Sequence, residues 1–199
     1  GAYRFLRRVW SFGHGFATDI RPQIGAQRTL AGAKLPEALA AFRREIHLLL
    51  KQANYDLGKQ QFNTVASATM KMLNALEKAP REGALAAEVI EECFGILLRV
   101  LSPLTPHISH ALWRELGYGD DILAAAWPEP LEAALVQDEV ELMLQVNGKL
   151  RGAVRVAADA PKEAIEAVAL AHEATVKFLE GRPAKKVVVV PGRLVNIVG

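Results

Sequence analysis

The sequence has a single cysteine, Cys93, and therefore cannot form an internal disulfide bond. It has no apolar run near the roughly 20 residues that a membrane-spanning helix needs, and no charged-then-apolar leader with a small-residue cleavage site. The net charge is only +2, so charge alone does not indicate a nucleic-acid partner. These absences exclude a disulfide-stapled or membrane-embedded protein, and they favour a cytoplasmic protein without a membrane partner.

The sequence also lacks recognisable nucleotide-binding, metal-binding and catalytic motifs. The sequence contains no GxxxxGK[ST] loop, no glycine-rich dinucleotide turn and no cysteine cluster. His107 and His110 stand three residues apart without a third ligand nearby, so a surface or capping role is favoured over a metal site. Glu88, Glu91 and Glu92 are interpreted as the solvated face of a helix. We therefore predict no catalytic residue, no metal site and no cofactor in this chain.

The composition is that of an ordinary globular protein, with 51% hydrophobic and 23% charged residues. The charges are nevertheless unevenly distributed. Residues 1–51 hold nine Lys and Arg against three Asp and Glu, residues 52–136 hold six against eleven, and residues 137–199 hold nine against eight. The two ends are thus basic relative to the middle, which directs attention to the basic stretches.

Apolar residues recur at steps of three and four over the first half of the chain, which predicts amphipathic helices. The predicted helices cover residues 3–16, 36–58, 64–78, 84–101 and 106–117. Pro36 suits a first turn, Asn63 and Thr105 are predicted N-caps, and Pro103 stops the fourth helix. Residues 17–34 carry proline and glycine without a period and are predicted to form a loop.

Residues 117–138 lose this period and are predicted to connect two domains. After them the period becomes two, and Asn147-Gly148 is the strongest short hairpin signal. A helix from residue 160, capped by Asp159, and a second helical piece ending at Gly181 precede another strand pair. The predicted fold is an all-α helical bundle over 1–136 followed by a small β-β-α-β-β domain over 139–199.

Three basic stripes stand out. In the hairpin, alternation places Leu150 on an apolar face and Lys149, Arg151 and Arg155 on the opposite one. The other two stripes lie on predicted helices and consist of Arg4, Arg7 and Arg8, and of Arg43, Arg44, His47 and Lys51. Each stripe alone is typical of a solvated face, but together they favour phosphate contacts, which position a nucleic acid without reading its sequence. Because aromatic residues are sparse around them, double-helical RNA recognised by shape is favoured over single strands.

Several stretches carry a family resemblance: "YRFLRRVW", "FNTVASATMKMLNAL", "LSPLTPHISHALW", "LQVNGKLR", "KFLEG" and "VVPGRLVNIVG". Over nearly the whole chain they resemble the bacterial leucyl-tRNA synthetases. The element LxPxxPHxxxxLW is shared by several class I synthetases and indicates only their Leu/Ile/Val/Met group. The closing module, from the hairpin to the C-terminus, is more specific to the leucyl enzymes.

The resemblance implies a C-terminal piece of a larger enzyme that joins leucine to tRNA(Leu) with ATP and Mg²⁺. It implies that the catalytic and editing domains lie upstream, that the bundle packs on the anticodon-stem and D-arm side of the tRNA, and that the small domain touches the tRNA's outer corner. Bacterial leucyl enzymes generally do not read the anticodon, so this region is expected to position the tRNA. We expect a monomer whose partners are tRNA(Leu) and the upstream domains.

By position, Lys149 and Arg151 match the family's NGK-x-R hairpin, and Arg193 replaces the Lys of its PGK turn, with Asn196 at the expected step. His110 stands where related enzymes often have Glu. A plain turn at Pro191-Gly192 and a loop-capping amide at Asn196 are the alternative explanations. The residues that we predict to contact tRNA are Lys149, Arg151, Arg155, Lys177, Arg182, Lys185, Arg193, Arg43, Arg44 and Lys51.

Two other interpretations stay open. The chain could be the tRNA-binding region of another class I synthetase, which its C-terminal module disfavours. It could also be a protein–protein interaction module whose basic faces meet an acidic partner. The salt dependence of RNA binding separates the second alternative from the tRNA-binding interpretation.

Overall fold

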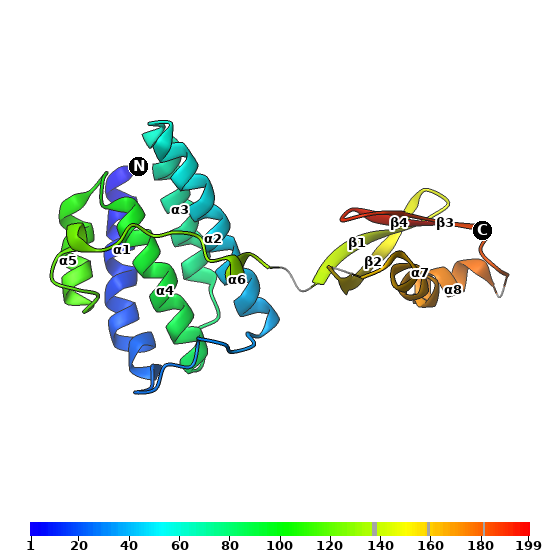
Figure 1. Ribbon diagram of the computed structural model, residues 1–199, viewed down its shortest axis with the longest axis horizontal. Helices are drawn as coiled ribbons and strands as arrows, with labels where there is room; N and C mark the ends of the chain where they lie inside the picture. The colour runs from blue at the N-terminus through cyan, green and yellow to red at the C-terminus, as the bar shows by residue number, and fades with distance from the viewer. Residues whose placement is uncertain (137–138, 159, 181) are drawn as a thin grey trace. The chain divides into compact units, whose positions relative to one another are not determined.

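The computed structural model divides the chain into two compact units, Gly1–Val136 and Gln137–Gly199. It describes residues 1–136, 139–158, 160–180 and 182–199. Figure 1 shows the helices of the first unit side by side, and a sheet with helices against it in the second. The predicted fold class, a helical bundle followed by a small α+β domain, is confirmed.

The first unit is helical because its apolar residues fall on one side of each helix at 3.6-residue spacing. Its elements are α1 (Ala2–Gly15), η1 (Phe16–Ile20), η2 (Arg21–Gln23), α2 (Glu37–Gly58), α3 (Phe62–Lys78), α4 (Ala84–Leu101), α5 (Pro106–Glu115), η3 (Ile122–Ala124) and α6 (Glu132–Leu135). Helix α4 lies at the centre, and its Phe94 is fully buried. The Phe94 ring packs against the rings of Phe12 and Phe16, with centroids 4.9 and 6.3 Å away.

The predicted loop 17–34 begins differently. Helix α1 continues into a π-helical turn, η1, and then a 3₁₀ turn, η2, before the chain becomes irregular. Phe16 and Ile20 are each only 1% exposed and lie four residues apart, so burial of both side chains holds the extra turn. The proline and glycines on which the loop prediction was based begin at Pro22, after the buried residues Phe16 and Ile20.

Two predicted helix starts are shifted. Helix α3 begins at Phe62 with Gln61 as its N-cap, so Asn63 is inside the helix and caps nothing. Pro36 is the N-cap of α2 rather than its first residue. Thr105 is the N-cap of α5, as predicted, but its side chain makes no capping hydrogen bond. Pro103 follows the end of α4, as predicted.

Residues 117–136, most of the predicted connector, form a strap packed on the first unit. The indole N–H of Trp127 donates to Asn54 Oδ1 in α2 at 2.9 Å. Further along, the backbone N–H of Leu131 donates to His47 Nδ1, also in α2, at 3.2 Å. The strap is therefore held to the bundle up to its final turn, α6. The connector's last two residues, 137–138, lie outside the described residues.

The second unit contains β1 (Glu139–Val146), β2 (Lys149–Ala157), α7 (Lys162–Ala171), α8 (Glu173–Leu179), β3 (Lys186–Val190) and β4 (Leu194–Val198). The strand order is β2-β1-β4-β3, with β1 and β4 parallel and the other pairs antiparallel. Ile165 and Ala169 of α7 pack with the buried strand residues Leu144, Val154 and Ile197. Helices thus cover one face of the sheet, as period-2 alternation with one apolar face requires.

The opposite face of this sheet is exposed within the described part of the unit. Met143, Leu150 and Val188 are 56%, 62% and 37% exposed. Between α7 and α8 the chain bends at His172, whose Nδ1 accepts the N–H of Ala174 at 3.2 Å. The predicted cap Asp159 and the predicted helix end Gly181 lie outside the described residues.

Candidate nucleic-acid interface

The hairpin tip of the second unit is built by a two-residue turn. Asn147 and Gly148 both have positive φ, 49° and 75°, as a type I′ turn requires. The turn is tied to β4, since the N–H of Asn147 donates to the Ile197 carbonyl at 2.8 Å and the N–H of Gly148 donates to Asn196 Oδ1 at 3.0 Å. Asn196 is thus a loop-capping amide, the alternative that the sequence left open, and it holds the tip against the neighbouring strand.

A β-bulge changes the direction of the side chains next to this turn. Leu144 pairs with Gly152 and Gln145 with Leu150, so Arg151 is an extra residue of β2 with no residue opposite it. Directly opposed residues share a face of the sheet. The prediction that Leu150 points to the apolar face is therefore wrong, because Leu150 lies opposite Gln145 and is 62% exposed.

The same bulge separates the three predicted cations. Lys149 pairs with Val146, which is buried on the helix-covered face, whereas Arg155 pairs with Glu141 on the opposite face. The prediction that Lys149, Arg151 and Arg155 all face the same way is therefore wrong. All three side chains are still exposed, so the hairpin presents basic groups on both of its faces.

The basic residues of the second unit differ in their partners. Arg155 lies near Glu141, with Nε 3.6 Å from Oε2, and Arg182 lies 3.6 Å from Glu180. The remaining predicted contacts are exposed and take part in no ion pair or side-chain hydrogen bond among the described residues: Lys149, Arg151, Lys177, Lys185 and Arg193. These five cations are free to meet an anion from outside.

The second unit also has a close approach at Gly152, beside the bulge. A Cβ atom placed on this residue would lie 3.2 Å from Cε1 of His172. Glycine therefore lets the bend between α7 and α8 pack directly on β2. Arg151, which the sequence analysis placed on a basic face, is thus the direct neighbour of a tightly packed residue.

In the first unit, the predicted stripe on α2 is divided between surface and interior. The side chain of Arg43 is 14% exposed and donates twice to Glu92 on α4, at 2.8 and 2.7 Å. His47 is 1% exposed and lies 2.8 Å from the same carboxylate through Nε2. Because His47 Nδ1 accepts from Leu131, the ring hydrogen is on Nε2, toward Glu92. Arg44 and Lys51 stay at the surface.

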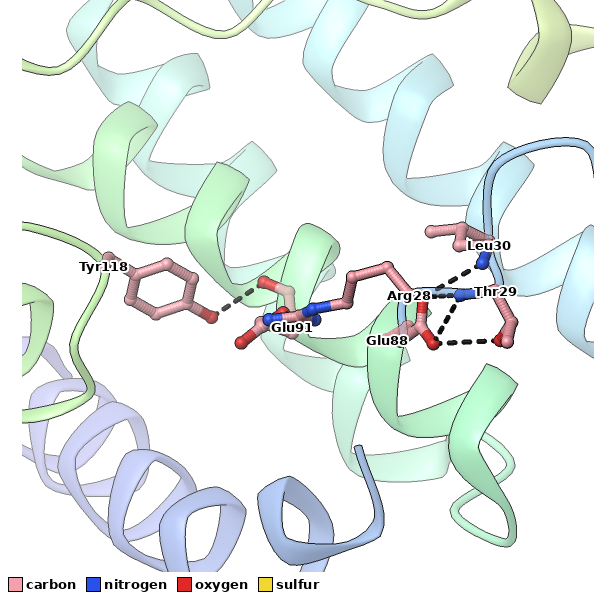
Figure 2. A network of polar contacts seen from close by, with 6 residues as sticks. All are labelled: Arg28, Thr29, Leu30, Glu88, Glu91 and Tyr118. Carbon is pink, nitrogen blue, oxygen red and sulfur yellow. Dashed lines mark hydrogen bonds and ion pairs between the residues drawn. The ribbon is translucent and has the colours of Figure 1, made fainter. Parts of the chain in front are cut away.

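The interpretation of Glu88, Glu91 and Glu92 as a solvated face is wrong. Glu88 is 3% exposed and accepts the N–H groups of Thr29 and Leu30 at 3.0 and 2.9 Å (Figure 2). Glu91 pairs with Arg28, and the hydroxyl of Tyr118 donates to the Glu91 carbonyl at 2.7 Å. Together these groups fasten the loop after η2 and the start of the strap to α4.

The protonation of these carboxylates follows from their contacts. Burial alone would raise the pKa of Glu88, but the hydrogen bonds from Thr29 and Leu30 outweigh it, so the pKa lies below its ordinary value. Burial also opposes ionisation of Glu92, and the hydrogen bonds of His47 and Arg43 again lower its pKa. Burial raises the pKa of the Cys93 thiol well above its ordinary value, helped by the nearby charge of Glu92. Glu88 is thus a structural anion that holds the loop at Thr29 and Leu30, and Glu92 is one that holds the guanidinium of Arg43.

The third basic stripe lies on α1 beside a groove of about 510 Å³. Arg4 and Arg7 are exposed there, and Arg7 lies over the Tyr3 ring, 5.9 Å from its centroid. Arg8 is paired with Glu77 on α3, its Nε donating at 3.0 Å. Each of the two helical stripes thus includes at least one arginine that bridges to another helix.

Within the described part of the chain, the structure shows neither a cluster of metal-ligand residues nor a membrane-spanning helix. No cluster of three or more His, Cys, Asp or Glu that could hold a metal is found among them. His110 Nδ1 accepts the N–H of Ile122 at 3.4 Å, and the same nitrogen lies 3.6 Å from Asp121. Within the same ranges, no helix combines the length and apolar character needed to cross a bilayer.

Sequence reasoning missed the partners of the buried charges and one surface cation. The interior pairs join residues 45 to 59 positions apart, which no local period reports. Lys59, the C-cap of α2, was also missed. Its signal was available, since it lies four residues after Tyr55 and therefore on the same side of the helix.

Comparison with known proteins shows what this chain is similar to. The family described as "Anticodon-binding domain of tRNA ligase" matches residues 40–166. Over 199 residues the chain is 71% identical to a leucine–tRNA ligase of Azoarcus sp. (strain BH72) and 66% identical to one of Aromatoleum aromaticum. All of this chain is covered in both matches, but it spans only 23% of each relative's length.

One solved structure is similar over nearly the whole chain. It is a ternary complex of an Agrobacterium radiobacter K84 LeuRS with tRNA and LeuAMS, with a TM-score of 0.72 and 25% identity. The match covers 98% of this chain and 24% of that one. The likeness therefore extends to a protein crystallised with tRNA.

Proposed function

We propose that this chain, which belongs to the family of anticodon-binding domains of tRNA ligases, positions a tRNA. The larger enzyme is a leucine–tRNA ligase that joins leucine to tRNA(Leu) in the cytoplasm, with ATP and Mg²⁺. The present segment supplies affinity and orientation for the tRNA and carries out no bond-making step. We further propose that the enzyme acts as a monomer and that the ATP and leucine sites belong to other parts of it.

The observation that carries this proposal is the set of free cations at the hairpin tip. Lys149 and Arg151 are exposed, lie on a tip fixed by two hydrogen bonds to β4, and have no acidic partner among the described residues. A phosphate backbone rewards fixed, unneutralised cations, because binding them releases condensed counterions. Arg193, beside the second turn, has the same character and adds to this surface.

Other predicted contacts take secondary roles in the proposal. Lys177 and Lys185 extend the basic surface of the small unit, and Arg155 and Arg182 can exchange their weak surface pairs for phosphates. On the bundle, Arg44 and Lys51 are proposed contacts. Arg43 is the weakest of the predicted contacts, because Glu92 already engages its guanidinium twice.

The test measures binding of a labelled tRNA(Leu) transcript to the whole chain at several salt concentrations. The logarithm of affinity should fall linearly with the logarithm of salt. The double variant Lys149→Ala/Arg151→Ala should bind more weakly and lower the slope by about two, one for each lost phosphate contact.

A second double variant, which also removes two positive charges, is the control for Lys149→Ala/Arg151→Ala. Lys71→Ala/Lys162→Ala removes one exposed lysine from each unit, one of them paired with Glu166, and should leave the slope unchanged. An unchanged affinity and slope for Lys149→Ala/Arg151→Ala would refute the hairpin assignment. Absence of salt-dependent tRNA binding by the unmodified chain would instead favour an acidic protein partner.

A further inference from the structure

The outward side of α2 carries a continuous line of side chains at steps of three and four residues. The line consists of Arg44, Leu48, Lys51, Tyr55 and Lys59, and we name it the α2 stripe. At about 100° per residue, these five positions fall within an arc of roughly 80° on the helix surface. With a rise of about 1.5 Å per residue, the stripe is about 22 Å long. It is therefore one narrow surface that a single partner can follow.

The cations of the α2 stripe are not neutralised by the protein. Lys51 and Lys59 are exposed and Arg44 is half-buried, and no ion pair within the described ranges involves any of the three. Arg43, directly beside Arg44 in sequence, is by contrast bound twice to Glu92. The helix thus directs one arginine inward and leaves its neighbour for an external anion. Glu37 lies two turns before Arg44 in the same phase and marks the acidic end of the line.

The α2 stripe also exposes apolar and aromatic surface between its charges. Tyr55 is 64% exposed, and Leu48, one turn before Lys51, is 50% exposed. The ammonium group of Lys59 lies 5.8 Å from the centroid of the Tyr55 ring, within the range of a cation–π contact. A tyrosine ring at the surface between lysines is the arrangement with which proteins stack an unpaired nucleobase while holding its backbone.

We propose that the α2 stripe contacts RNA at a place where an unpaired nucleotide adjoins a helix. Arg44, Lys51 and Lys59 hold backbone phosphates, and the Tyr55 ring stacks on the unpaired base. The proposal rests on the proposed tRNA-binding function and adds to it a second, aromatic contact surface on the bundle. RNA is the partner that fits this surface best. Its phosphates complement the three unpaired cations, and an unpaired base can stack on the Tyr55 ring.

The experiment uses the whole chain and two RNA probes, a tRNA(Leu) transcript and a 20-base-pair RNA duplex without loops. Lys51→Ala/Lys59→Ala should lower the salt slope for the tRNA by about two. The matched control Lys71→Ala/Lys78→Ala removes two exposed lysines from α3 and should leave that slope unchanged. Tyr55→Ala should weaken tRNA binding about tenfold, Tyr55→Phe should retain wild-type binding, and neither should alter binding of the duplex.

The outcomes separate this proposal from the one on which it rests. If Lys149→Ala/Arg151→Ala lowers the slope and Lys51→Ala/Lys59→Ala does not, the proposed RNA contact of the α2 stripe is refuted, while the proposed tRNA binding by the chain stands. If no variant changes the slope, the proposed function itself fails. Equal weakening of tRNA and duplex binding by Tyr55→Ala would overturn the stacking role. Tyr55 is exposed, so these variants are expected to keep the fold.

Discussion

Arg43 of the bundle and Arg151 of the small unit show two opposite uses of an arginine. In the bundle, arginines bridge helices and loops through carboxylates, as Arg43 does with Glu92 and Arg28 with Glu91. In the small unit, the N–H groups of the hairpin turn donate neutral hydrogen bonds to β4, and Lys149 and Arg151 have no acidic partner among the described residues. Arginine is therefore structural at Arg28 and Arg43 and available to a partner at Arg151.

The comparison teaches that the count of basic residues is a poor guide to a binding surface. Residues 1–51 carry the largest surplus of positive charge, yet part of that surplus is neutralised by glutamates of α4. Residues 137–199 have almost no surplus, yet Lys149, Arg151 and Arg193 there are exposed and take part in no ion pair among the described residues. Availability is decided by long-range pairing, and the following changes test that distinction.

The largest effect is expected from Glu92→Ala. It leaves Arg43 and His47 facing each other without their carboxylate in a mostly buried position, which should lower the free energy of unfolding of the bundle by about 3 kcal/mol. Urea unfolding at pH 7 followed by tryptophan fluorescence measures it, because all three tryptophans lie within residues 1–136. Glu45→Ala, at an exposed carboxylate of α2, the helix that carries Arg43 and His47, should cost less than about 0.5 kcal/mol. Equal costs would mean that Glu92 is an ordinary surface residue.

A smaller, pH-dependent effect is expected from Glu88→Gln. The folded-state pKa of Glu88 is lowered, so its stabilising contribution is complete above its unfolded pKa and is lost as pH falls through the folded pKa. The substitution should cost about 1–3 kcal/mol at pH 7, and the cost should shrink at pH 3. Unfolding of both proteins at the two pH values measures the difference. A cost independent of pH would show that the ionised carboxylate is not what holds the loop.

The smallest effect is expected from Asn196→Ala. It removes the acceptor for the Gly148 N–H and should destabilise the hairpin tip by about 1 kcal/mol, seen as roughly fivefold faster amide hydrogen exchange in β1 and β2. Arg151→Ala should leave that exchange unchanged, since Arg151 has no partner among the described residues. If Arg151→Ala loosens the hairpin as much as Asn196→Ala does, the contrast between the two units is lost.

Local patterns were sufficient for the long helices of the bundle and for the hairpin of the small unit. The 3.6-residue period predicted the bundle helices, and the change to a period of two, with Asn147-Gly148 at its centre, predicted the hairpin. These signals depend on residues close in sequence, which is why they succeed. The extra helical turn at Phe16–Ile20 was missed because its anchors are only two residues and no full period forms.

The site was predicted less completely, for two physical reasons. Glu88 and Thr29 are 59 positions apart, and nothing in the glutamate's own neighbourhood indicates that it is buried. The bulge at Arg151 inserts one residue into β2, and the alternation of Leu150, Gly152 and Val154 fits an unbulged strand equally well. Pairing with β1 decides the side-chain directions, and a single strand does not contain that information.

The burial of Cys93 has a practical consequence for studying this chain. Its thiol is fully buried and its pKa is raised well above the ordinary value, so the reactive thiolate is nearly absent at neutral pH. A cysteine introduced at an exposed position, such as Lys149 or Lys59, becomes the one reactive handle for a fluorophore or spin label in the folded protein. The hairpin and the α2 stripe can therefore each be followed in solution by a reporter, with the native cysteine left in place.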